Sequence, residues 1–233
     1  MLRSLKELER YAVSATDGEV GTVVDFLLDD EPWTVRYLIV ATSFLEGHRV
    51  LISPISFRQA DWSTQRFHLA LTKDKVKNSP SVNVDAPVSR QHERDSGLWG
   101  GEAGGDVHLR SASELRGYHI QGNDKAVGYV EDFIVDDETW EVRYLAIDTS
   151  NWWIGKKVLV APAWAKSVSW EERKIYVDMS REAIKGSPEW NANAPVNREY
   201  EARLYDYYGR PVYWASGDRP QAPPPVPKGN HPA

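Results

Sequence analysis

Short segments in which apolar and polar side chains alternate recur along the chain, and this period of two predicts β-strands. In residues 24–28 every second side chain is apolar. Residues 29–32 read Asp-Asp-Glu-Pro and favour a turn, and the apolar run at residues 35–40 follows. This order of alternating segment, turn and apolar segment predicts a β-hairpin.

The hairpin segment occurs twice in the chain. Residues 21–38 read GTVVDFLLDDEPWTVRYL, and residues 128–145 read GYVEDFIVDDETWEVRYL. The match continues upstream and downstream, so that each copy spans roughly ninety residues, which is the size of a domain and too long for a solenoid unit. Chance does not explain a match of this length, and the chain is therefore predicted to hold two tandem domains.

The boundaries of these domains follow from changes in composition. Residues 1–94 form the first repeat and residues 108–214 the second. Residues 95–107 are rich in glycine, which predicts a flexible linker. Residues 215–233 are rich in proline and have few apolar side chains to bury, so we expect a disordered tail.

Each copy holds five or six short strands, and it lacks the long intervening sequence that an α/β fold needs for its helices. We predict a mainly β protein with two small antiparallel β-barrels, separate and closed, each followed by a short helix. The predicted strands outside the hairpins are residues 11–13, 49–53, 66–71, 157–161 and 174–179, and the predicted helices are residues 72–78, 180–186 and 197–209.

The hairpin register decides where two charged side chains of each hairpin lie. If Phe26 pairs with Val35, an acid and a base face each other across the two strands, and such a pair stabilises a hairpin modestly. The same pairing applies in the second copy. We therefore predict structural ion pairs between Asp25 and Arg36 and between Asp132 and Arg143.

Composition limits the kinds of function that the chain can have. It has no cysteine, which excludes disulfides and thiolate chemistry. The formal net charge is −6 and no basic stripe is present, so direct nucleic-acid binding is not expected. The N-terminus has no secretory apolar stretch, and no apolar run approaches the length of a membrane span. We expect a cytoplasmic protein, with peripheral membrane association left open.

Candidate chemistry is sparse. The acidic runs at residues 29–31 and 136–138 could bind a divalent cation, but they lack the glycine-spaced calcium loop and fit solvated turns better. The six histidines show no metal-binding spacing, and nucleophile-elbow and phosphate-loop motifs are missing. We predict no catalytic residue, no metal and no cofactor.

The order of the repeated motif is similar to that of the PRC-barrel domain: a glycine, V-x-D-F-x-x-D-D, Trp, V-R-Y-L and then K-V-L-V-x-P. That family is named for the cytoplasmic domain of the photosynthetic reaction-centre H subunit, and it includes the C-terminal domain of a ribosome maturation factor. Residues 169–178, 195–201 and 205–211 resemble stand-alone bacterial members most closely. The resemblance implies a module that docks on other macromolecules and has no catalytic motif.

Trp152 and Trp153 are the best candidates for partner binding, with Lys156 and Lys157 beside them. Aromatic side chains next to cations in a loop are common at protein interfaces. The alternative is that the two rings cover their own barrel or fill the contact between the barrels. The first copy has residues 44–49, Phe-Leu-Glu-Gly-His-Arg, at this place, which is consistent with a partner surface on one copy only.

Four functions remain open from sequence. The first is a non-enzymatic protein-interaction or scaffolding module with an unidentified protein partner. The second is a peripheral subunit of a membrane-associated photosynthetic or electron-transfer complex. The third is a ribosome-assembly or RNA-processing factor, and the fourth is a hydrolase or a binder of small ligands, which requires a concave pocket with convergent polar groups.

Overall fold

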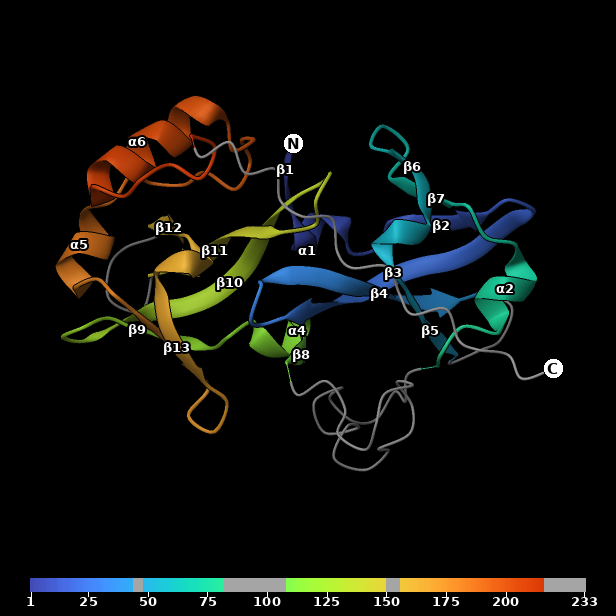
Figure 1. Cartoon of the computed structure of the whole chain (residues 1–233), viewed down its shortest axis with the longest axis horizontal. Coiled ribbons are helices and arrows are strands. Elements are labelled where there is room, and N and C mark those ends of the chain that lie inside the picture. Colours follow the sequence, from blue (N-terminus) through green and yellow to red (C-terminus); the bar gives the residue numbers. More distant parts are fainter. Residues whose placement is uncertain (44–47, 82–107, 150–155, 216–233) are drawn as a thin grey trace.

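The structure is a computed structural model. It describes residues 1–43, 48–81, 108–149 and 156–215. The fold is mainly β, as the alternating pattern predicted, and it consists of two seven-stranded sheets with short helices at their edges (Figure 1). The predicted linker at residues 95–107 and the predicted tail, apart from Ala215, lie outside the described residues.

The first sheet runs in the order β5-β4-β3-β2-β7-β6, with β8 also paired to β3. Every neighbouring pair is antiparallel except β2 with β7, which is parallel. Its strands are β2 (Ala12–Ala15), β3 (Gly18–Asp29), β4 (Thr34–Thr42), β5 (Arg49–Ile52), β6 (Phe57–Asp61), β7 (Arg66–Leu69) and β8 (Leu109–Ser111).

The second sheet repeats this plan in the order β12-β11-β10-β9-β14-β13, with β1 also paired to β10. Its one parallel pair is β9 with β14, the equivalent of β2 with β7. Its strands are β1 (Leu2–Ser4), β9 (His119–Gln121), β10 (Ala126–Asp136), β11 (Val142–Asp148), β12 (Lys157–Val160), β13 (Ala165–Ser169) and β14 (Lys174–Val177).

Short helices connect the strands, and their ends match the capping residues in the sequence. Thr72 caps one helix and Ser180 another, each by accepting a hydrogen bond from the backbone N–H three residues on. The helices are α1 (Leu5–Leu8), η1 (Pro54–Ser56), α2 (Lys73–Lys77), α4 (Ala112–Leu115), η2 (Pro162–Trp164), α5 (Arg181–Gly186) and α6 (Arg198–Tyr208). Gly209 ends α6 in the left-handed conformation, at φ 60°.

Two parts of the barrel prediction are wrong. Neither sheet closes on itself: among the described strands, β5 and β6 remain the unjoined ends of one sheet, and β12 and β13 those of the other. The cores are also not separate, since one cluster of buried apolar side chains contains residues of both sheets. The reason is that the two copies exchange segments, which an alignment of the repeats does not reveal.

The exchange is reciprocal. β1 begins the first copy in sequence, yet it pairs with β10 of the second sheet, where Arg3 lies opposite Val135. β8 begins the second copy and pairs with β3 of the first sheet, where Arg110 lies opposite Leu28. Each sheet therefore contains one strand from the other repeat, and Figure 1 shows β1 beside β10 and β8 beneath the blue strands of the first sheet.

The predicted hairpin register is wrong in both copies. Phe26 pairs with Leu38, and Phe133 with Leu145. Asp29 pairs with Thr34, so the turn at residues 30–33 is longer than the predicted register allows, and irregularities within β3 and β10 displace the remaining pairs. The predicted ion pairs are therefore absent from the described contacts: Arg36 binds Asp29 at 2.9 Å and Arg143 binds Glu141 at 2.7 Å, while Asp25 and Asp132 have other partners.

Candidate functional site

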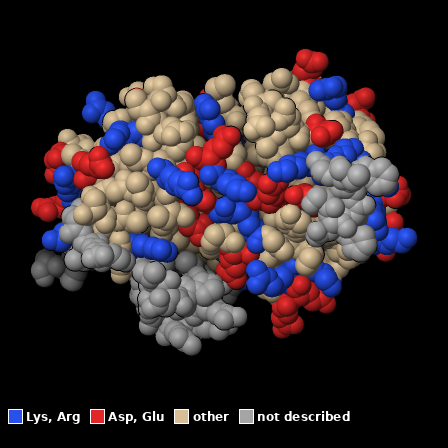
Figure 2. All heavy atoms as spheres, turned by 180° about the vertical axis from the view of Figure 1, so that it is seen from behind, with Lys and Arg blue, Asp and Glu red and all other residues tan. Residues whose placement is uncertain are grey.

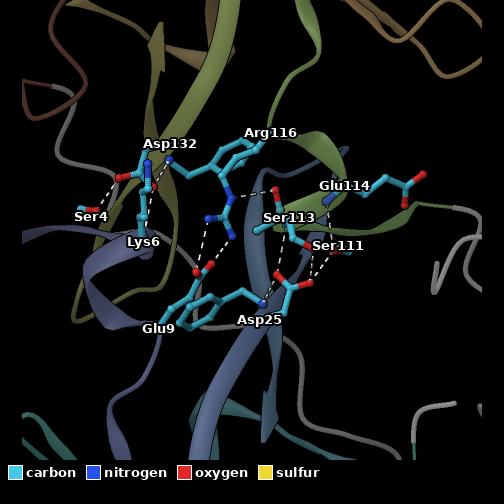
Figure 3. A network of polar contacts seen from close by, with 12 residues as sticks. Ser4, Lys6, Glu9, Asp25, Ser111, Ser113, Glu114, Arg116 and Asp132 are labelled. Atoms are coloured by element: carbon cyan, nitrogen blue, oxygen red, sulfur yellow. Dashed lines mark hydrogen bonds and ion pairs between the residues drawn. The ribbon is translucent and has the colours of Figure 1, made fainter. Parts of the chain in front are cut away.

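The buried aspartates Asp25 and Asp132 fix the exchanged segments in place. The Asp25 carboxylate accepts hydrogen bonds from the Ser113 backbone N–H at 3.1 Å and the Ser113 hydroxyl at 2.7 Å. It also accepts one from the hydroxyl of Ser111, which caps α4 (Figure 3). Asp25 thus anchors the start of α4, which the second repeat contributes to the first sheet.

Asp132 does the same for α1. It accepts hydrogen bonds from the hydroxyl of Ser4, which caps α1, and from the backbone N–H of Lys6 at 3.1 Å. Burial raises the pKa of Asp132, and the hydrogen bonds from Ser4, Phe133 and Lys6 oppose that shift. Both acids therefore have structural partners, although these are not the arginines that the sequence suggested.

Between these two anchors, Glu9 and Arg116 form an ion pair across the junction (Figure 3). Arg116 Nη1 donates to Glu9 Oε2 at 3.3 Å, and both side chains are about four-fifths buried, with exposed fractions of 20% for Glu9 and 19% for Arg116. The two residues are equivalent in the two repeats, since each directly follows the glutamate-leucine pair of its copy. Identical residues here would bring two like charges together.

The tips of the two hairpins also exchange contacts. The backbone N–H of Val35 donates to the carbonyl of Trp140 at 2.8 Å, and that of Val142 donates to the carbonyl of Trp33 at 2.7 Å. Trp33 and Trp140 have positive φ angles of 52° and 61°, an uncommon conformation for a bulky residue. Both side chains are buried.

Trp140 fills the core of the first sheet. Its ring lies 5.4 Å from the ring of Phe57, 6.0 Å from that of Phe67 and 6.4 Å from that of Phe26, measured between centroids. All three phenylalanines belong to the first repeat, so a side chain of the second repeat completes their packing. Contacts of this kind add to the area that the rings bury.

Trp33 occupies the equivalent place beside the second sheet, but its surroundings differ. There a groove of about 430 Å³ lies between the tip of the first hairpin and β13. We call it the junction groove. Its lining residues are Asp30, Glu31 and Trp33 from the hairpin tip, His108 before β8, Pro162 and Ala163 of η2, Ala165, Lys166, Ser167 and Val168 of β13, and Trp170.

Small side chains account for the open space of the junction groove. Ala165 stands where the first repeat has Phe57, and Ala163 where it has Ile55. Phe57 stacks on Phe67 with 4.8 Å between ring centroids and meets the edge of Trp140, so the ring fills the corresponding space in the first repeat. An alanine methyl group cannot do so, which leaves the face of Trp33 bordered by a hollow.

One wall of the junction groove is acidic. The Asp30 carboxylate is buried and bound to His108 Nδ1 at 2.8 Å, with Arg110 Nε at 3.9 Å. Burial raises the pKa of Asp30, while His108 and Arg110 act in the opposite direction. The Glu31 side chain is 72% exposed and has His108 Nε2 at 3.6 Å. The Asp30 carboxylate is therefore held by contacts within the protein, whereas the Glu31 carboxylate is exposed to solvent.

The opposite wall is the edge strand β13. Among the described strands it pairs with β14 only, so one side of its backbone has no strand beside it. Lys166 is the cation on this strand, and its ammonium group binds Asp178 at 3.0 Å and the side-chain oxygen of Asn123 at 2.8 Å. Its charge is thus compensated within the protein.

The sequence-predicted partner-binding residues lie elsewhere. Trp152 and Trp153 lie outside the described residues. Lys156 Nζ donates to the carbonyls of Lys185 and Ser187 at the end of α5, and Lys157 Nζ binds Glu131 at 2.6 Å. The two lysines therefore hold β12 to its neighbours. The junction groove was missed, although a comparison of the copies at Ala165 and Phe57 contained its signal.

A second buried acid, Glu201 of α6, has only structural partners among the described residues. It accepts hydrogen bonds from the hydroxyls of Tyr144 at 2.7 Å and Tyr213 at 2.8 Å, and Arg198 lies 3.1 Å away. The pKa of Tyr144 is raised by burial and by the nearby Glu201 carboxylate. This network attaches α6 to β11 and keeps the Glu201 carboxylate buried.

Electrostatic features provide no other site on the described part of the chain. No group of three or more histidine, aspartate or glutamate side chains that could hold a metal ion is found there. Figure 2 shows the face opposite to that of Figure 1, where acidic and basic side chains are mixed and a band of both signs lies between the two lobes. No helix of the described residues is long and apolar enough to cross a membrane.

Comparison with known protein families finds a match to part of the chain. Residues 108–184 match the PRC-barrel domain. The match begins just before β8 and ends within α5, so it includes the strand that the second repeat contributes to the first sheet and leaves out α6. A search among curated proteins found no match.

Proposed function

We propose that the chain is a non-enzymatic protein-interaction module, built as a tandem PRC-barrel protein whose docking surface lies where the two repeats meet. The match of residues 108–184 supports the family of the second repeat. The repeated sequence and the matching strand order of the first sheet support the same assignment for residues 1–81.

The junction groove is the observation that carries this proposal. It lies where both repeats meet, it borders an edge strand, and its space results from Ala163 and Ala165. Within the described chain no convergent set of acid, base and nucleophile faces it, since Asp30 is bound by His108 and Lys166 by Asp178. The groove is therefore better suited to binding a partner than to catalysing a reaction.

Site-specific photo-crosslinking in living cells tests the proposal. A photoreactive amino acid at Ser167, in the junction groove, should yield a discrete crosslinked species. The matched control is Gln59, which is also exposed and is the equivalent residue on β6 of the first sheet. Crosslinks at Ser167 and not at Gln59 are expected. Equal yields at both positions, or no product at Ser167, would contradict a docking role for the groove.

A further inference from the structure

We infer that the junction groove binds an extended, basic segment of a partner protein, which adds to the edge of β13 as a further strand. This inference rests on the proposed function and specifies the chemistry of its partner. Three features of the groove support it: a strand edge, an apolar floor and one exposed acidic side chain at its rim.

The first feature is the unpaired edge of β13, the end strand of the second sheet among the described strands. β13 pairs with β14 through Ser167 with Tyr176, Val168 with Ile175 and Ser169 with Lys174. In an antiparallel pair, alternate residues direct their backbone N–H and C=O groups away from the partner strand. Residues 165–168 of β13 line the junction groove, so the groove borders this strand edge. An extended segment satisfies such groups through main-chain hydrogen bonds.

The floor of the groove selects the side chains of that segment. Side chains of a strand alternate between two faces, so every second side chain of a docked segment is directed inward. The inward positions meet the apolar surfaces of Ala163, Ala165 and Val168 and the ring of Trp33. The missing phenylalanine ring at position 165 leaves room for an aliphatic side chain of medium size.

The acidic wall selects the charge. Glu31 is exposed at the rim, and the other ionised groups of the groove already have partners: Asp30 with His108, and Lys166 with Asp178. A basic side chain next to the inward aliphatic one can pair with Glu31, whereas an acidic one meets repulsion from Glu31. The preferred partner therefore alternates aliphatic and basic residues.

The second hairpin supplies a control within the same molecule. Glu138 is the equivalent of Glu31, but it lies at the tip beside the first sheet, where Phe57 fills the space next to Trp140. A change of charge at Glu138 alters the net charge of the protein as much as the same change at Glu31. It should leave the junction groove untouched.

A titration with defined peptides tests the inference. The probes are two capped hexapeptides, one with three Lys-Val repeats and one with three Glu-Val repeats; six extended residues span about 20 Å, enough to cover β13. The full-length chain, labelled with ¹⁵N, is followed by NMR. The Lys-Val peptide should shift the amide signals of residues 166–169 and the Trp33 indole signal, and it should bind at least tenfold more tightly than the Glu-Val peptide.

Two variants complete the test. E31K should weaken binding of the Lys-Val peptide at least tenfold, while E138K should leave it within a factor of two. A165F introduces the phenylalanine that the first repeat has at this position, and it should block binding by filling the groove. If A165F fails to fold, the comparison of E31K with E138K still tests the inference. Equal binding of both peptides, equal effects of E31K and E138K, or signal shifts away from β13 would each overturn the inference. If any of these results occurred while Ser167 still gave specific crosslinks, the inference of a basic partner segment would be wrong, but the proposed docking role of the groove would still hold.

Discussion

The carboxyl group of Asp132 is ionisable, although it is buried where water is largely excluded. Its side chain is buried against α1, and its hydrogen bonds come from Ser4 and from two backbone N–H groups. Asp124 differs, since it is exposed and its pKa is lowered mainly by the backbone N–H of Arg181, which donates at 2.8 Å. The two aspartates should therefore make opposite contributions to the pH dependence of stability.

The pH dependence of D132N tests the burial of Asp132. Because the pKa of Asp132 is raised above 3.8, folding favours its protonated form. The free energy of unfolding of the wild type relative to D132N should thus be greatest below pH 3.8 and should decline as the pH rises through the raised pKa. Urea unfolding at several pH values measures this difference.

D124N is the matched control for this measurement. The pKa of Asp124 lies below 3.8, so the advantage of the wild type over D124N should be present above that pH and should be lost as the pH falls. Parallel pH profiles for the two variants would contradict the assignment of Asp132 as an acid whose ionisation burial disfavours.

At the scale of single elements, the two hairpin tips are the parts that join the sheets. Each tip donates and accepts a backbone hydrogen bond with the other, and each places a tryptophan beside the sheet of the other repeat. Trp140 is surrounded by three phenylalanine rings, whereas Trp33 borders the junction groove. The same residue type thus has two different packing environments.

W140A should destabilise the protein by about 3–5 kcal/mol, the usual loss for a large aromatic side chain removed from a core. W33A should cause a smaller loss, because the space beside Trp33 is already partly open. Both variants keep a non-glycine residue at the strained backbone position, so the difference reports on packing. Thermal and urea unfolding of the two proteins measure it, and a larger loss for W33A would contradict this account of the cores.

Elements with local signals could be predicted from the sequence. The hairpins, the two short helices and α6 follow from alternation, capping residues and Gly209, all of which act between residues close in the chain. The register could not be predicted, because irregularities in β3 and β10 depend on packing against the rest of the sheet. β1 and β8 were missed, since three residues carry too weak a pattern to show which sheet they join.

The candidate site was less predictable than the fold. Loop aromatics drew attention to Trp152 and Trp153, which remain a hypothesis. The junction groove depends on residues far apart in sequence, such as Glu31 and Val168, and only the exchange between repeats brings them together. Its one sequence signal is that Ala165 stands where the first repeat has Phe57. That difference predicts a groove only when the hairpin tip of the first repeat is known to lie beside β13.

For the whole molecule, the two repeats share strands and one cluster of buried apolar side chains, so we expect them to fold as one unit. Each sheet includes a strand of the other repeat, and Glu9 pairs with Arg116 between them. Opposite charges at these equivalent positions favour pairing of the first repeat with the second, and disfavour pairing of either repeat with a copy of itself.

A cut between the repeats tests this unity. A protease site placed within residues 82–107 allows the folded full-length chain to be cleaved, and the two fragments should then stay together. We expect co-elution at the size of the intact chain in size-exclusion chromatography, because separation would remove β8 and Trp140 from the first sheet and β1 and Trp33 from the second. Separate elution of two folded fragments would show that the exchanged contacts are dispensable.

The reciprocal exchange has a consequence for biosynthesis. The strands that the first repeat contributes to the first sheet end at Leu69, but β8 and Trp140 leave the ribosome later, and at roughly 5–20 residues per second this delay lasts several seconds. During that interval the nascent chain exposes the rings of Phe26, Phe57 and Phe67 without their final neighbour. The first repeat can therefore complete its fold only after the second repeat has been translated as far as Trp140, about a third of its length.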